Sequence, residues 1–378
     1  MGRAALLSGS VAAPGHGRLQ VAWIVGPWSD AVFFLGLPFL AAAAAFVGHI
    51  FLSAVAVASI ALWIDVPHQF VTLIRTFGVA KDRRQFWNQL LVGLILISAV
   101  IATGLTWAPL SLLLLSTLWN HQHQLMQLHG FARVYDFKAS AGNVSGGRWD
   151  LTLAWVLYGN LFLSSPLFTT FWLRECYRLG LPLSAFDVHT VHFFSWLTAG
   201  IFLICYVIAI VGRYQSGIPL NPVKYLFIVS NYAVLYFVCW HTLSVFVYGI
   251  ANIIMHGVQY IVFVHVYLQR STAGPDTYRG FVRWLVQPRH LPVFVGLLTV
   301  YVVLYQLMSG RPLDELGFGA VHLASHYEAV PEVQLRAMSV LTGREIWLLT
   351  LLNVPGLLHL YYDSFIWKVR EKKTQGGL

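Results

Sequence analysis

Long apolar stretches, separated by short polar segments, make up most of the chain. A helix needs roughly 20 mostly apolar residues to cross the hydrocarbon core of a bilayer. The run from Lys224 to Gln269 is too long for one crossing, so we divide it near residues 241–247. The pattern predicts ten membrane-spanning helices, at about 31–47, 51–74, 88–106, 109–133, 150–172, 187–212, the two halves of 224–269, 291–308 and 346–367.

The composition supports this interpretation. Hydrophobic residues make up 57% of the chain and charged residues only 10%, and the mean hydropathy is +0.66. Soluble domains carry about 25% charged residues, so this chain has too few charges to cover a soluble surface. We therefore expect an all-α, polytopic membrane helical bundle, with residues 1–378 forming a single integral membrane domain.

Basic residues concentrate in alternate loops, which predicts the orientation of the chain. One set of loops contains RTFGVAKDRR, RVYDFKASAGNVSGGR and the tail KVREKK, whereas the other set has few Lys or Arg. Both termini should thus be cytoplasmic, with residues 1–30 as a cytosolic tail and 309–345 as a long amphipathic extracytoplasmic segment. The net charge of +9 fits anchoring in the lipid bilayer of a cell membrane, for which we favour a bacterial inner membrane, and does not indicate nucleic-acid binding.

Histidines occur in four of the predicted helices, in the half nearer the cytoplasm. The segments are WIDVPHQF, LWNHQHQLMQLHGFARVYDFK, NIIMHGVQYIVFVHVY and LLHLYYDSF. Ionisable groups within a bilayer are costly and usually mark function. Any one of these histidines is as readily a hydrogen-bonded core residue as a ligand, so the prediction depends on their convergence. The predicted metal ligands are His68, His121, His123, His129, His256, His265 and His359.

Helical phase, at about 100° per residue, refines this prediction. Asp65 and His68 share one polar face, and His359 and Asp363 are four residues apart. His121 and His129 project within about 80° of each other, so they can share a site. His123 points elsewhere, and we expect it to lie behind the ligands or to pair with another helix.

Imidazole is a neutral ligand suited to iron, copper and zinc, and nearby carboxylates can orient its ring. Iron, in a mononuclear or dinuclear site, is the expected cofactor, with copper, zinc or haem as alternatives. We expect the side chains that support the cofactor to be Gln124, Gln259, Asp65 and Asp363. Tyr260 should shape the catalytic pocket, and Arg75 and Arg133, at the cytoplasmic ends of their helices, are candidates to hold an anionic head group of the substrate.

A further group of histidines falls at the opposite face of the membrane: His189, His192, His241, His322 and His326. Polar residues are ordinary in or beside water, so we interpret this group as part of an interfacial surface. The three cysteines are isolated and provide neither a disulfide framework nor a thiolate metal site.

The segments HQHQLMQLHG, PHQF, MHGVQY and HLYYD resemble the histidine-rich multi-pass membrane oxygenases, a class that includes fatty-acid desaturases, alkane hydroxylases and bacterial β-carotene dioxygenases. The resemblance implies histidine-bound iron that activates O2, a hydrophobic small-molecule substrate and an electron donor. The chain lacks the HxxHH box of the desaturases, and its HxxxH pair, His322 and His326, falls on the predicted outer side. Two other function classes stay open: a proton or metal-ion transporter, and a haem-binding membrane electron carrier.

Overall fold

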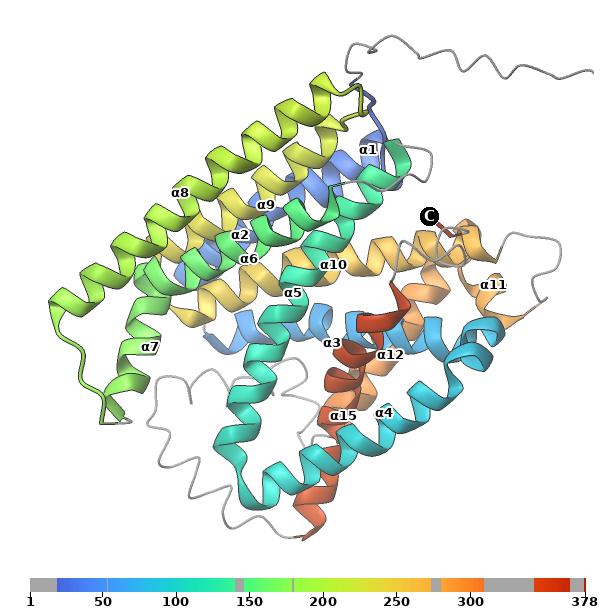
Figure 1. Cartoon of the computed structure of the whole chain (residues 1–378). Coiled ribbons are helices and arrows are strands. Elements are labelled where there is room, and N and C mark those ends of the chain that lie inside the picture. Colours follow the sequence, from blue (N-terminus) through green and yellow to red (C-terminus); the bar gives the residue numbers. More distant parts are fainter. Residues whose placement is uncertain are drawn as a thin grey trace, which may run out of the picture.

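The computed structural model describes residues 19–52, 54–139, 146–178, 180–272, 280–308, 343–367 and 377–378. Over these ranges the chain is helical apart from turns, connecting segments and an isolated β-bridge between Leu19 and Leu220 (Figure 1). The helices are α1 Pro27–Asp30, the π-helix η1 Ala31–Gly36, α2 Leu37–Phe51, α3 Ala54–Gly78, α4 Ala80–Trp107, α5 Pro109–Ala139, α6 Gly147–Ser164, α7 Pro166–Arg178, α8 Ala185–Gln215, α9 Pro222–His241, α10 Val245–Ser271, α11 Phe281–Leu285, the 3₁₀ helix η2 Pro288–His290, α12 Leu291–Met308 and α15 Gly343–Ile366.

The predicted all-helical fold is confirmed over the described residues. Within the described ranges, six helical segments are long and apolar enough to cross a bilayer: Pro27–Phe51, Asp82–Trp107, Ala185–Gln215, Pro222–His241, Phe246–Ser271 and Pro288–Tyr305. The pair α6 and α7 makes a seventh if the two form one span. The helices α3, α5 and α15, which carry most of the candidate ligands, are not among these segments.

Two interruptions divide long apolar runs. The run predicted as one helix over 150–172 consists of α6 and α7, which meet at an angle of 67°. Ser165 is extended there, because Pro166 disfavours a helical conformation in the residue before it. The second interruption lies within the predicted break at 241–247, where α9 ends at His241 and the Ser244 hydroxyl caps the start of α10.

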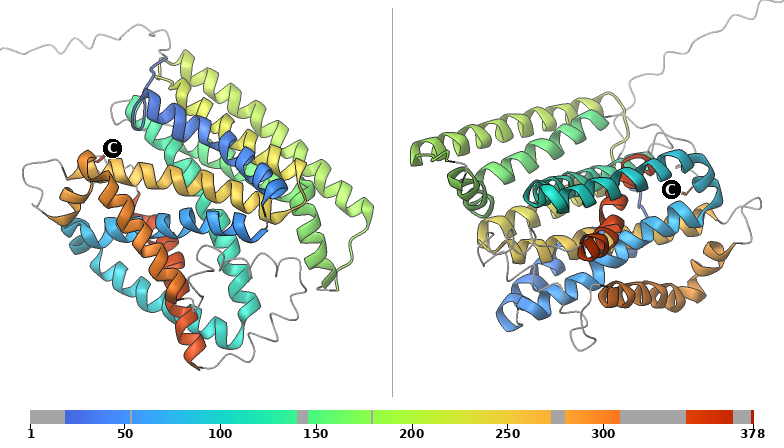
Figure 2. Two further views of the ribbon diagram at one scale, coloured as in Figure 1. Left: turned by 180° about the vertical axis from the view of Figure 1, so that it is seen from behind. Right: turned by 90° about the horizontal axis from the view of Figure 1, so that it is seen from below.

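The helices form two groups that are connected by α5 and α10 (Figures 1 and 2). In one group α6 packs against α7 and α8, and α2 against α9; in the other, α3, α4, α12 and α15 pack together. The helix α10 contacts α2, α9 and α3, while α5 contacts α6, α9, α4 and α15. Side chains from both groups can therefore meet along α5 and α10.

The last residues of the predicted cytosolic tail pack onto the bundle. Asp30 is fully buried, and its carboxylate accepts the backbone N–H groups of Ile24 at 2.7 Å and Val25 at 2.9 Å. Ile24 is buried as well, so the packed part of the chain begins before residue 30. Residues 1–18 of the predicted tail, and 309–342 of the predicted extracytoplasmic segment, lie outside the described residues.

Candidate metal centre

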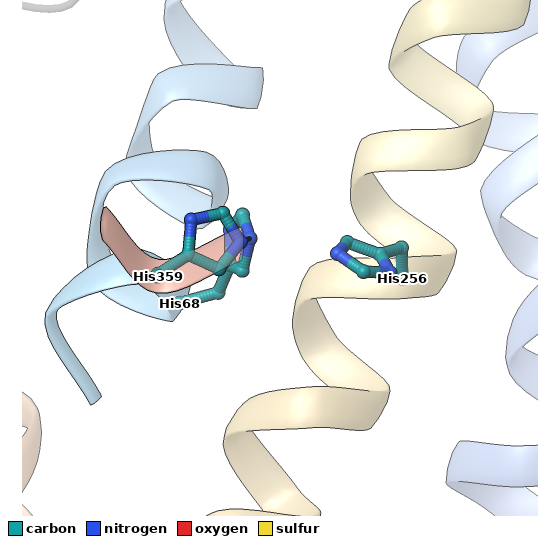
Figure 3. Close-up of side chains that lie close together, drawn as sticks. All are labelled: His68, His256 and His359. Carbon is teal, nitrogen blue, oxygen red and sulfur yellow. Dashed lines mark hydrogen bonds between the residues drawn. The ribbon is translucent and has the colours of Figure 1, made fainter. Parts of the chain in front are cut away.

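Four histidines from four helices meet in the interior, and we call them the histidine cluster: His68 on α3, His123 on α5, His256 on α10 and His359 on α15. Each is less than a tenth exposed. The Nε2 atoms of His68 and His359 lie 3.1 Å apart. One ring nitrogen from each of His68, His256 and His359 lies within 4.8 Å of the other two (Figure 3). The His123 ring centroid is 5.2 Å from that of His256 and 4.9 Å from that of His359.

A close approach of two helices places these side chains. A Cβ atom at Gly257 would lie 2.8 Å from Ile64 Cγ2 and 3.7 Å from His68 Cβ, so any other residue there would force Ile64 or the two helices to move. The adjacent His256 ring points from α10 toward the other two rings in Figure 3. From α5, the Gln127 side chain donates to the His256 carbonyl at 3.0 Å and fixes that helix against α10.

Contacts behind the cluster orient two of the rings. The His359 Nδ1–H donates to the Gly356 carbonyl at 2.5 Å, which leaves the lone pair on Nε2. His68 Nδ1 lies 3.4 Å from a carboxylate oxygen of Asp65, and Gln69 donates to the other oxygen at 3.0 Å. A proton on His68 Nδ1 would likewise leave its Nε2 lone pair facing His359. With the His68 proton on Nε2 instead, the two atoms share a hydrogen bond at 3.1 Å; with it on Nδ1, both lone pairs are available to a cation.

The donor set fits a transition-metal ion. The Nε2 atoms of His123 and His256 are buried and have no hydrogen-bond partner among the described residues. A buried polar atom without a partner costs about 1–3 kcal/mol, and a metal ion would remove that cost. Bonds of about 2.0–2.1 Å to histidine nitrogen put ligand atoms roughly 3–4 Å apart. Nitrogens of the cluster that lie as much as 4.8 Å apart would need to approach by roughly 1 Å to reach these separations.

A buried phenol and carboxylate adjoin the cluster, and we call them and their partners the Tyr260 network. Tyr260 Oη donates to Asp363 Oδ1 at 2.7 Å and hydrogen-bonds Thr72 Oγ1 at 2.6 Å. The Trp367 indole N–H lies 3.2 Å from both Tyr260 Oη and Asp363 Oδ1. The other carboxylate oxygen, Asp363 Oδ2, has no hydrogen-bond partner among the described residues and lies 3.8 Å from His123 Nε2.

Three of the predicted ligands lie outside the cluster. His121 packs among the rings of Tyr158, Phe168 and Tyr248, and His265 lies against Phe294. His129 lines a separate pocket together with Arg133. On α5 it is His123 that faces the cluster, whereas the sequence favoured the pair His121 and His129. Residues two apart project about 200° from each other, so the rotation of α5 decides between them.

The remaining predicted residues make structural contacts near the cluster or elsewhere in the core. The Arg75 guanidinium lies 3.4 Å from the centroid of the Trp367 ring, stacked on it, and donates to the Ile366 carbonyl at 2.8 Å. Gln124 accepts a hydrogen bond from Asn252, and Gln259 donates to Asn231 at 3.1 Å. Sequence reasoning missed Gly257, Gln127 and Trp367. Of these three, only Gly257 had a signal in the sequence, its position next to His256 in the segment MHG.

The histidines of the predicted outer face make local contacts. His192 Nε2 lies 2.9 Å from Thr169 Oγ1. His241 is exposed and stacks on Phe237, and His189 is exposed. His322 and His326 lie outside the described residues.

Comparisons with known proteins do not extend this description. No protein-family model, curated protein or solved structure matches the chain. The histidine cluster is therefore interpreted from its own geometry.

Proposed function

We propose that this protein is a membrane-bound, metal-dependent oxidoreductase whose histidine cluster binds iron. The observation that supports this most is the set of three buried imidazole nitrogens within 4.8 Å of one another, with a fourth histidine beside them. Such nitrogens suit iron, copper and zinc, and the resemblance to membrane oxygenases favours iron. The proposal includes ten membrane crossings, cytoplasmic termini and a bacterial inner membrane.

Iron bound there would supply the redox chemistry of O2 activation. The chain's own residues would hold the ion, exclude water and manage protons. Asp65 and the Gly356 carbonyl orient His68 and His359, as partners behind metal-bound histidines do. The Tyr260 network can hold a proton at Tyr260 Oη or Asp363 Oδ1, and the other carboxylate oxygen, Asp363 Oδ2, lies 3.8 Å from His123 Nε2. A lipid-soluble substrate would reach the site laterally from the bilayer, and an electron donor would act as partner.

Specific distances weigh against the alternatives. Two axial histidines of a haem stand on opposite faces of the macrocycle, with nitrogens roughly 4 Å apart for bonds near 2.0 Å. The Nε2 atoms of His68 and His359 lie closer than that, at 3.1 Å, so this pair does not have the separation of axial haem ligands. A transporter needs polar groups that continue to the other face. The described histidines there make local contacts, His192 with Thr169 and His241 with Phe237.

Metal analysis tests the proposal directly. We expect protein purified in mild detergent to contain stoichiometric iron by plasma mass spectrometry, and His68→Ala and His359→Ala to lose most of it. His241→Ala is the matched control, because His241 is exposed and away from the cluster. All variants should elute as wild type in size exclusion. Wild-type protein without iron, copper, manganese or zinc would overturn the metal site.

Three further readouts separate the function classes. O2 uptake that depends on a lipid-soluble substrate and is lost in His68→Ala supports the oxidoreductase. A Soret band in the visible spectrum would instead indicate haem. Ion flux into reconstituted vesicles that is abolished by the same substitution would indicate a transporter.

A further inference from the structure

A second group of buried charges lies on α5, α6 and α9, apart from the histidine cluster. Lys224 is fully buried and donates to Asp136 at 2.9 Å and to Asp150 at 2.7 Å. Arg133 donates to Asp136 at 2.8 Å and lies 3.6 Å from Asp150. The two carboxylates thus balance Lys224 and Arg133, and any further cation nearby makes this region positive.

An open pocket of about 600 Å³ lies beside these charges, and we call it the α6 pocket. Its lining includes Arg133, Arg148 and His129. Arg148 is exposed and adds a positive charge to the balanced group. The Nδ1 atom of His129 is buried and has no hydrogen-bond partner among the described residues. The pocket therefore offers cationic groups, and an unsatisfied imidazole nitrogen, to an anion.

Two glycines let the guanidinium groups approach the start of α6. A Cβ atom at Gly147 would lie 3.0 Å from the Arg133 guanidinium, and one at Gly146 would meet Arg213 even more closely. Gly146 also has a φ of 80°, a conformation that favours glycine. Among the described residues no side chain caps this helix terminus, whose backbone N–H groups add to the positive potential.

The pocket also has an apolar side. Trp149 and Leu151 line it, and Trp149 is 40% exposed. Tryptophan is enriched where a helix passes from hydrocarbon to head groups. Basic pockets between membrane helices bind lipid head groups, and Arg133 and Arg148 of this pocket belong to a basic segment that we predict to be cytoplasmic. From this combination we infer that the α6 pocket binds the phosphate group of an anionic membrane lipid, with its acyl chains beside Trp149.

Delipidated full-length protein, titrated with lipids and examined by native mass spectrometry, tests this inference. We expect phosphatidylglycerol to bind more tightly than phosphatidylcholine, and Arg148→Gln to weaken phosphatidylglycerol binding about fivefold, the usual effect of removing one basic residue at an anionic lipid surface. The matched control is Arg289→Gln, which removes the same charge from another exposed position on the predicted cytoplasmic side. Arg148 is exposed and outside the buried ion pairs, so its loss should not impair folding.

Three outcomes would overturn the inference. Equal affinity for the two lipids would remove the role of the anionic head group. Equal weakening by Arg289→Gln would mean that overall charge, and not the pocket, attracts the lipid. Saturable binding of inorganic phosphate without preference for phosphatidylglycerol would assign the pocket to a soluble ligand. None of these results depends on metal in the histidine cluster.

Discussion

Asp65 is the residue through which the orientation of His68 can be tested. Its carboxylate lies 3.4 Å from His68 Nδ1 and is itself held by Gln69. Partners of this kind typically contribute 10–100-fold, roughly, to metal affinity. We expect Asp65→Asn to weaken iron binding by about that factor, as measured by competition with a chromogenic chelator, while His68→Ala should weaken it more. Unchanged affinity in Asp65→Asn would show that the carboxylate does not orient the ring.

At the same scale, the seven histidines predicted as ligands include all four of the cluster, but the sequence did not separate these from His121, His129 and His265. His68, His256 and His359 were predicted because each is an ionisable residue in a predominantly apolar helix, a criterion that His265 also meets. His123 could not be preferred over His121, since α5 carries polar side chains on several faces and its rotation depends on packing against α10 and α15. Residues without a polar signal, Gly257 above all, gain their role only from the neighbouring helix.

Between elements, the close approach of α3 and α10 can be tested at Gly257. An alanine Cβ there would lie 2.8 Å from Ile64 Cγ2, so the helices must separate or Ile64 must move. Overpacking of this kind costs about 1–3 kcal/mol, and a shift of α10 also carries His256 away from His68. We expect Gly257→Ala to lower both the thermal midpoint and the iron content.

The matched control is Gly249→Ala in the same helix, where a Cβ atom meets nothing within 4 Å. Alanine is favoured over glycine within a helix by about 1 kcal/mol, so this variant should be neutral or slightly stabilising. The same loss of iron in both variants would contradict a specific role for the α3–α10 contact.

Helix boundaries were more predictable than helix packing. The break between α9 and α10 follows from length alone, because the run of 224–269 exceeds one bilayer crossing. The bend between α6 and α7 had a signal in Pro166 that the apolar pattern obscured. No signal in the sequence indicated the two helix groups or the position of α5 and α10 between them. Membrane helices are apolar on most faces, so periodicity does not show which face meets which neighbour.

For the whole molecule, the histidine cluster predicts a link between metal binding and stability. His68 and His359 belong to helices of one group, whereas His123 and His256 belong to α5 and α10, which contact both groups. An ion bound by the cluster would therefore connect that group to α5 and α10, which contact both groups. A ligand that binds only the folded state at 100 times its Kd stabilises it by about 2.7 kcal/mol. Removing iron with a chelator should accordingly lower the thermal midpoint of the wild-type protein. His68→Ala should already have the lower midpoint and should not respond to the chelator. A midpoint that the chelator lowers equally in both proteins would mean that the stabilising ion lies elsewhere.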